Sequence, residues 1–329
     1  MMMSRYILIA IICFTTLVVK AQDSQFSMYD ASQLLLNPAY AGTDEGSKLR
    51  AVSQYRSQWA SLSSNFITSS LAVDMPFKDR WGLGAYLFHN DASNIVNETG
   101  VVFSGSYDVM KPDQDVHHLT TGLNLGFINK NINDKELFYD NQYQDGTFNT
   151  TIESGETFAR TNRFMPEVSF GVAYINNDKN KTYRPYGGFS LFHITKPNES
   201  YINTFNSRVP LRWVLNGGMK LYFQNEEIEI DPKFLLMKQS NSWDIILGFT
   251  GGYQVGKTVK VLGGGTFRIG DAIIPQLGVE YLNFTYAMSY DINISKLKEY
   301  SNRRGALEFV VTYKGIGRFN MESTGVPRM

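Results

Sequence analysis

The feature that most constrains this chain is an alternation of apolar and polar residues with a period of two, which recurs along most of its length. Two segments near the end show it clearly. Phe284, Tyr286, Met288, Tyr290 and Ile292 alternate with Thr285, Ala287, Ser289, Asp291 and Asn293, and Leu307, Phe309, Val311 and Tyr313 alternate with Glu308, Val310, Thr312 and Lys314. Period two is the spacing of side chains on one face of a strand, and helical periodicity is poor, so the chain is predicted to be all-β.

Strands of this kind fit either a secreted soluble sandwich with one solvated face or a transmembrane β-barrel with a polar lumen. After residue 21 no run of about 18 apolar residues remains, which excludes a helical membrane protein. A charge facing lipid near the bilayer midplane costs about 2–4 kcal/mol, and Glu308 and Lys314 both fall on the polar parity. The aromatic share of 14% suits interfacial girdles. We therefore predict a transmembrane antiparallel β-barrel, with the soluble sandwich as the alternative.

The alternating segments number about fourteen and are separated by turn-forming residues. They are expected at residues 47–57, 65–75, 81–90, 95–110, 116–130, 163–176, 183–195, 207–224, 226–238, 242–255, 258–268, 272–282, 284–294 and 305–315, so that the barrel spans 47–315 and a tail spans 316–329. The longest connections, near 131–162, 196–206 and 295–304, all follow odd-numbered strands. Short periplasmic turns alternating with longer outer loops are typical of outer-membrane barrels, which is the localisation we predict.

Residues 1–21 have the pattern of a secretory signal peptide. Arg5 provides the charged start, residues 6–19 form an apolar run, and Val19-Lys20-Ala21 places small residues before a cleavage site. The run is shorter than the roughly 20 residues of a spanning helix, so cleavage before Gln22 is expected, and an uncleaved anchor is the alternative.

Residues 22–46 precede the first predicted strand. The dipeptide Asn37-Pro38 favours turn initiation within them. We expect a periplasmic N-terminal segment at the barrel mouth, where it packs against the entrance. The sole cysteine, Cys13, lies in the predicted signal peptide after Ile12, which argues against a lipid anchor and leaves no disulfide for the mature chain.

Charge and motifs argue against several other functions. Lys and Arg balance Asp and Glu at 31 each, so binding to nucleic acid is not expected. Residues 251–258 match the P-loop pattern GxxxxGK[ST], but a poor helix follows, and we interpret Gly256-Lys257 as a hairpin turn. His117 and His118 point to opposite faces of one strand, and no G-x-S-x-G turn occurs. We expect no enzyme activity, no catalytic or metal-binding residues and no cofactor.

The longest connection combines polar residues with aromatic ones. Residues 131–162 contain Asn, Asp, Gly and Thr together with Tyr139, Tyr143, Phe148 and Phe158. Exposed aromatic side chains often anchor protein contacts, so these four are candidate partner-binding residues. A merely solvated outer loop is the alternative.

Several short fragments occur in a distinctive order in the first part of the mature chain. They are Asn37, Pro38, Ala39, Tyr40 and Gly42, then Tyr55, Arg56 and Trp59, then Gly82 and Gly84. The series resembles the PorP/SprF family of type IX secretion system membrane proteins of gliding and related Bacteroidetes, and the resemblance extends over the mature chain.

The resemblance implies an outer-membrane component of the type IX secretion system. Such a protein supports export or surface attachment of a large secreted protein such as a gliding adhesin. It also implies contact with membrane lipid and with periplasmic secretion or motor-anchoring components. The same barrel would also suit a diffusion channel for small solutes or lipids, which conductance would distinguish from a plugged or partner-filled lumen. An outer-membrane hydrolase would require a Ser–His pair within hydrogen-bond reach.

Overall fold

A computed structural model describes residues 23–316 except positions 45, 60–64, 79, 111–115, 135–136, 138, 145, 150, 153–154, 156–159, 203–205 and 225. The predicted signal peptide and C-terminal tail lie outside the described residues, apart from Ile316. Among those residues, no helix has the length and apolar character needed to cross a membrane.

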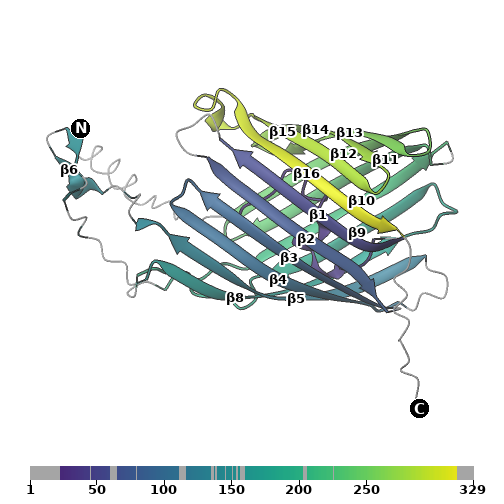
Figure 1. The fold of residues 1–329 in the computed structure, drawn as a ribbon, viewed down its shortest axis with the longest axis horizontal. Coiled ribbons are helices and arrows are strands. Elements are labelled where there is room, and N and C mark those ends of the chain that lie inside the picture. The colour runs from purple at the N-terminus through teal and green to yellow at the C-terminus, as the bar shows by residue number, and fades with distance from the viewer. Residues whose placement is uncertain are drawn as a thin grey trace, which may run out of the picture.

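Fourteen strands of the described chain form one closed antiparallel barrel (Figure 1). They are β1 (Ser47–Gln58), β2 (Phe66–Phe77), β3 (Trp81–Ala92), β4 (Val96–Asp108), β5 (His117–Ile132), β8 (Asn162–Asn176), β9 (Tyr183–Phe192), β10 (Arg212–Phe223), β11 (Ile228–Gln239), β12 (Ser242–Val255), β13 (Val259–Arg268), β14 (Ala272–Tyr281), β15 (Phe284–Asn293) and β16 (Arg304–Ile316). Sequential strands pair, and β1 pairs with β16 to close the barrel. The predicted fold class and strand number are confirmed.

The alternation of the sequence separates the two faces of the wall. On β15 the outward side chains Tyr286 and Met288 are 47% and 43% exposed, whereas Ser289 and Asp291 are 2% exposed and point inward. Glu308 on β16 is fully buried, and its neighbour Phe309 is 45% exposed. The apolar parity therefore forms the outer surface and the polar parity forms the lumen, as predicted.

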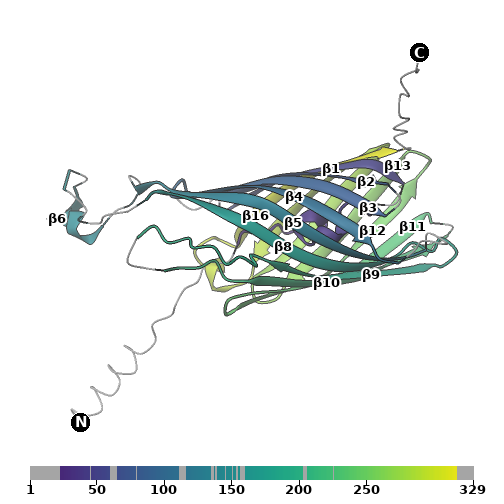
Figure 2. The ribbon, with the colours of Figure 1, turned by 90° about the horizontal axis from the view of Figure 1, so that it is seen from below.

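The connections differ in length between the two ends of the barrel. At one end, called the loop end here, they are residues 59–65, 93–95, 133–161, 193–211, 240–241, 269–271 and 294–303. At the other, the turn end, they are residues 78–80, 109–116, 177–182, 224–227, 256–258 and 282–283. Strand β6 (Tyr143–Gln144) pairs with β7 (Thr147–Phe148) in a small hairpin of the longest connection. This hairpin stands away from the barrel at the loop end (Figures 1 and 2).

Two turns show how local sequence determines the hairpins. Gly256 has a φ of 76° between β12 and β13, so the P-loop-like segment is a hairpin turn, as predicted. Leu282, in the two-residue connection between β14 and β15, has a φ of 55°. Positive φ is uncommon for leucine, and no Gly or Pro marks this turn in the sequence.

Candidate functional site

The lumen is occupied by the beginning of the described chain. We call residues Asp23–Asp44 the lumen segment; it includes the 3₁₀ turns η1 (Gln33–Leu35) and η2 (Pro38–Tyr40). The backbone N–H of Asp23 donates to Gln239, the last residue of β11 at the loop end. From there the segment descends to the turn end, where β1 begins at Ser47. The sequence predicts a segment at the barrel mouth, whereas these contacts extend along the lumen because its polar wall supplies partners throughout.

Near the loop end, an ionic cluster holds the backbone of the lumen segment. Glu308 accepts hydrogen bonds from the N–H groups of Ser27 and Met28 at 2.7 and 2.9 Å. Arg56 lies 2.8 Å from Asp291 and 3.4 Å from Glu308. All of these wall side chains are at most 3% exposed. The guanidinium compensates two buried carboxylates, and both of them bind the segment, since Asp291 accepts a hydrogen bond from the Ser27 hydroxyl at 2.7 Å.

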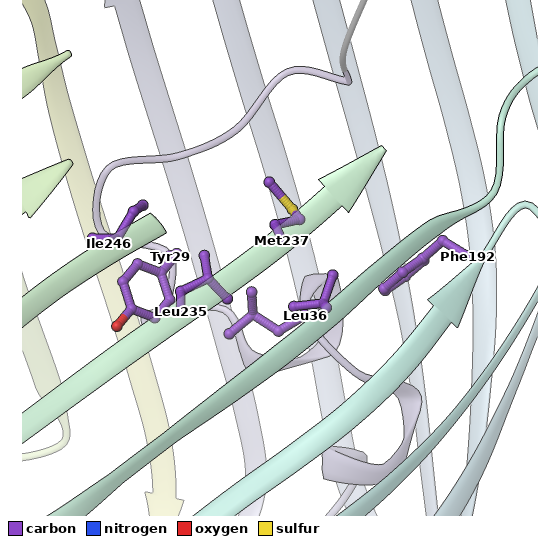
Figure 3. Close-up of a cluster of buried hydrophobic side chains, with 7 residues drawn as sticks. Tyr29, Leu36, Phe192, Leu235, Met237 and Ile246 are labelled. Atoms are coloured by element: carbon purple, nitrogen blue, oxygen red, sulfur yellow. The ribbon is translucent and has the colours of Figure 1, made fainter. Parts of the chain in front are cut away.

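An apolar cluster packs the middle of the lumen segment against the opposite wall. Tyr29 and Leu36 of the segment contact a patch formed by β9 to β12 (Figure 3). The wall residues of this cluster are Phe192, Val214, Leu235, Met237 and Ile246. The outer face of these strands is also apolar, so strands β9 to β12 carry apolar side chains on both faces here.

The fragment Asn37–Gly42 lies deep in the barrel, toward the turn end. Asn37 is fully buried and caps η2, since its Oδ1 accepts the N–H of Ala39 at 2.9 Å. Its Nδ2 donates to the backbone carbonyls of Val172 and Phe189 at 3.0 and 3.2 Å. One amide thus shapes the turn and ties it to β8 and β9.

Hydroxyl groups of the wall donate to three backbone carbonyls within or next to this fragment. Ser190, Thr120 and Ser106 donate to the carbonyl oxygens of Leu36, Ala39 and Ala41 at 2.6, 2.8 and 2.7 Å. The Tyr40 hydroxyl accepts a hydrogen bond from Asn216 at 2.9 Å. Backbone groups inside the barrel are therefore paired with the wall, as burial requires.

Glycines of the wall allow the close approach of Asn37–Gly42. A Cβ on Gly82 would lie 1.9 Å from the carbonyl oxygen of Ala41, and one on Gly122 would lie 2.4 Å from the nitrogen of Ala39. Gly171 and Gly188 would meet the Asn37 side chain at 1.9 and 2.7 Å. A Cβ on Gly84 would lie 2.9 Å from Leu34. The wall is therefore shaped to fit this segment.

A second ionic group fixes the lumen segment at the turn end. Arg50 Nε lies 2.9 Å from Asp74, whose other oxygen accepts the N–H of Gly42 at 2.8 Å. Asp44 lies 2.8 Å from Lys314 on β16. Charged side chains therefore hold the segment on both sides of the apolar cluster, toward the loop end and toward the turn end.

At the loop end, Asp23 joins a histidine-centred network. His193 lies 2.7 Å from Asp23 and 2.6 Å from Glu167, and Arg212 lies 2.9 Å from Asp23. Burial alone lowers the pKa of His193, but the charges and hydrogen bonds of Asp23 and Glu167 outweigh it and raise the pKa to about 10. Burial opposes the ionisation of Asp23, yet His193 and Arg212 hold its pKa well below the usual range. The network is an array of ionised groups at neutral pH.

The structure brings most of the family-motif residues together. Five of them lie in the lumen beside Gly82 and Gly84: Asn37, Pro38, Ala39, Tyr40 and Gly42. Arg56 binds the same segment nearer the loop end. Tyr55 instead points outward and is 44% exposed, and Trp59 packs edge-on against Phe66 just beyond β1. These two aromatic residues belong to the outer surface and its rim.

The candidate partner-binding aromatics lie in the longest connection. Tyr143 and Phe148 pair across the β6–β7 hairpin with ring centroids 5.0 Å apart, and they are 53% and 54% exposed. Tyr139 precedes the 3₁₀ turn η4 (Asp140–Gln142) and is half-buried. Phe158 lies outside the described residues. Their role in binding stays a prediction.

Sequence reasoning missed several residues that hold the lumen segment. Gly122, Gly171 and Gly188 are not singled out there, and Asp291 and Glu308 are noted only for their parity. Their one sequence signal is a charge or a glycine on the inward parity of a strand. His117 and His118 lie on opposite faces, near Tyr174 and Asp108 respectively. No group of three His, Cys, Asp or Glu side chains among the described residues is arranged to hold a metal ion.

Comparisons with known proteins agree with this architecture. The toluene transporter TbuX of Ralstonia pickettii superposes with a TM-score of 0.51 at 11% identity, covering 90% of this chain and 96% of that one. The toluene transporter TodX of Pseudomonas putida gives 0.51 at 10% identity, covering 88% and 94%. At these identities the likeness concerns the outer-membrane barrel fold alone. No curated protein matches the chain. The model of the type IX secretion system membrane protein family PorP/SprF matches residues 18–313, and this outer-membrane chain belongs to that family.

Proposed function

We propose that the protein is a non-enzymatic docking component of the type IX secretion system that supports export or surface attachment of a large secreted protein, such as a gliding adhesin. The observation that carries this proposal is the occupied lumen. Residues from Asp23 to Asp44 run through it and are bonded to the wall at both ends. A barrel closed in this way acts through its exposed ends rather than through an open path.

The loop end is the proposed site for the secreted partner. The β6–β7 hairpin projects from it and exposes the paired rings of Tyr143 and Phe148. Exposed aromatic pairs are common anchors of protein interfaces, because they bury a large area at low entropic cost. In this proposal the turn end faces the periplasm, where components of the secretion or motor apparatus meet it.

A diffusion channel for small solutes or lipids is the second candidate. The fold likeness to two toluene transporters favours it. Against it stand the ionic groups that hold the lumen segment, since a permeating solute has to displace them. Planar-bilayer conductance separates the two functions. We expect no steady conductance from the wild type, and a steady ohmic current without any protein partner would favour the channel.

The docking proposal is tested by changing Tyr139, Tyr143, Phe148 and Phe158 together to Ala. Anchor residues contribute about 2 kcal/mol or more each, so pull-down of the secreted partner from solubilised outer membranes should fall at least about 30-fold. Tyr300→Ala is the matched control, because Tyr300 is 77% exposed in a different connection of the loop end. Barrel assembly is followed by heat-modifiable gel migration. Undiminished recovery by the fourfold variant would contradict docking at this connection.

Orientation is tested by epitope tags. A tag within residues 140–155 should be accessible to antibody on intact cells, and a tag within residues 177–182 should become accessible only after permeabilisation. The physical reason is that the two connections lie at opposite ends of the barrel. The reverse labelling pattern would overturn the proposed direction.

A further inference from the structure

The loop-side half of the lumen contains a cavity of about 100 Å³ that no contact of the proposed docking function uses. It lies between the start of the lumen segment and the inner wall from β1 to β11. Phe26, Tyr29 and Leu36 line it from the segment. The wall residues that line the cavity come from the loop-end parts of their strands, so the cavity lies toward the loop end rather than the turn end.

Most of the cavity surface is apolar. Phe88, Ile128, Phe192, Val214 and Met237 approach it from five different strands. Its volume is somewhat smaller than that of a cavity of roughly 150 Å³ that accepts benzene, and it is open on one side. A single ring or a short alkyl chain fits such a space if its head group projects through the opening.

The polar side of the cavity presents acceptors that need a donor. Asn90 and Glu98 are directly opposite on β3 and β4, with both side chains on the inward parity. The buried Oδ1 of Asn90 has no hydrogen-bond partner, and Glu98 forms no hydrogen bond or ion pair with the described residues. Lys130, the nearest wall cation across from Glu98, lies 2.8 Å from Glu199 instead. Two adjacent acceptors are thus left without a donor.

The charges that line the cavity favour a cationic head. Asp23, Glu98 and Glu167 are opposed only by His193 and Arg212, which already bind Asp23 and Glu167. Among the described residues of the lining, Glu98 is thus the one carboxyl group without a basic partner. A ligand ammonium beside Glu98 and Asn90 Oδ1 supplies the missing donors and stabilises the carboxylate form of Glu98.

We propose that this cavity is a binding site for a small amphipathic amine, with a body of one aromatic ring or a short alkyl chain and a primary ammonium head held by Glu98 and Asn90. The ligand lies against Phe26 and Leu36, so it also stabilises the lumen segment in its seated position. Binding therefore raises the unfolding temperature of the barrel, because the ligand binds the folded state and not the unfolded state.

The test uses 2-phenylethylamine as the probe and 3-phenylpropionate as its matched anion. Calorimetry with the full-length mature protein in lipid nanodiscs should give saturable binding of the amine and at least about 10-fold weaker binding of the acid, since a charge-assisted hydrogen bond is lost and a repulsion is added. Glu98→Gln should weaken binding of the amine at least 10-fold and should not weaken binding of the acid.

Two tryptophan variants separate the cavity from non-specific partitioning. Thr68 lines the cavity, and Leu71, on the same strand, faces outward with 49% exposure. Thr68→Trp should abolish amine binding and the amine-induced rise in unfolding temperature, whereas Leu71→Trp should change neither. Absence of saturable binding by the wild type, equal affinity for amine and acid, or binding that survives Thr68→Trp in a correctly assembled barrel would each overturn the proposal.

Discussion

A single methyl group on Gly82 is expected to unseat the turn-end part of the lumen segment. The Cβ of Gly82→Ala would lie 1.9 Å from the Ala41 carbonyl oxygen and 2.5 Å from Ser106 Oγ. Ordinary contact begins near 3.4 Å, so the Ala41 carbonyl has to retreat by roughly 1.5 Å. That movement breaks the 2.7 Å hydrogen bond from Ser106 to Ala41.

The cost of the change follows from these two effects. Overpacking costs about 1–3 kcal/mol and the lost hydrogen bond about 0.5–1.5 kcal/mol, which gives about 1.5–4.5 kcal/mol for local release of the segment. Hydrogen exchange of the Gly42 amide, which donates to Asp74 at 2.8 Å, should therefore accelerate about 10-fold or more. The measurement is mass-spectrometric exchange on the assembled barrel in nanodiscs.

Gly105→Ala is the matched control for this experiment. Gly105 lies on β4 opposite the outward-facing Leu83, and a Cβ placed there meets nothing within 4 Å. The same chemical change should therefore leave exchange of the lumen segment at the wild-type rate. If Gly82→Ala also exchanged at that rate, or if Gly105→Ala loosened the segment equally, the reasoning about close approach would be refuted.

Three further outcomes are expected. Arg56→Met leaves the buried Glu308 without its cation, and leaves Asp291 only with Arg268 at 3.5 Å. It should lower the free energy of unfolding by about 3–5 kcal/mol, measured by denaturant titration; no loss would show that the Arg56–Glu308 pair does not stabilise the fold. Asp23 and Glu167 raise the pKa of His193 to about 10. The stability that protonated His193 contributes is therefore full below its ordinary pKa near 6.5 and is lost as pH rises through 10. Denaturation midpoints should fall between about pH 7 and 11 in the wild type but not in His193→Gln. Lys257→Ala should leave assembly intact, and neither protein should retain ATP in a filter-binding assay; retention abolished by the change would support the nucleotide alternative.

The strands of the barrel wall can be predicted because the residues of each strand carry its pattern. Residues such as Phe284 and Tyr286 repeat with period two, and a lipid-facing charge is costly enough to keep Glu308 on the other parity. One predicted strand boundary is wrong although the sequence carries a local signal for it. The strand expected at 207–224 begins instead at Arg212, after Pro210, which has no N–H for the strand ladder.

The contents of the lumen are not predictable in the same way. The inward parity indicates a polar interior but gives no sign of what occupies it. Asn37 contacts Val172, and Ser27 contacts Glu308, across 135 and 281 residues of sequence. No periodicity connects such positions. Family resemblance identifies Asn37 and Gly82 as notable, yet only the three-dimensional arrangement shows that they belong to one packed site.

The position of the lumen segment also constrains the order of assembly. Two of its charged partners lie at the junction of the first and last strands, where Arg56 on β1 is paired in register with Glu308 on β16. Glu308 holds the N–H groups of Ser27 and Met28, so the segment gains these contacts only when β16 has joined the wall. Final seating of the segment therefore accompanies or follows closure of the barrel.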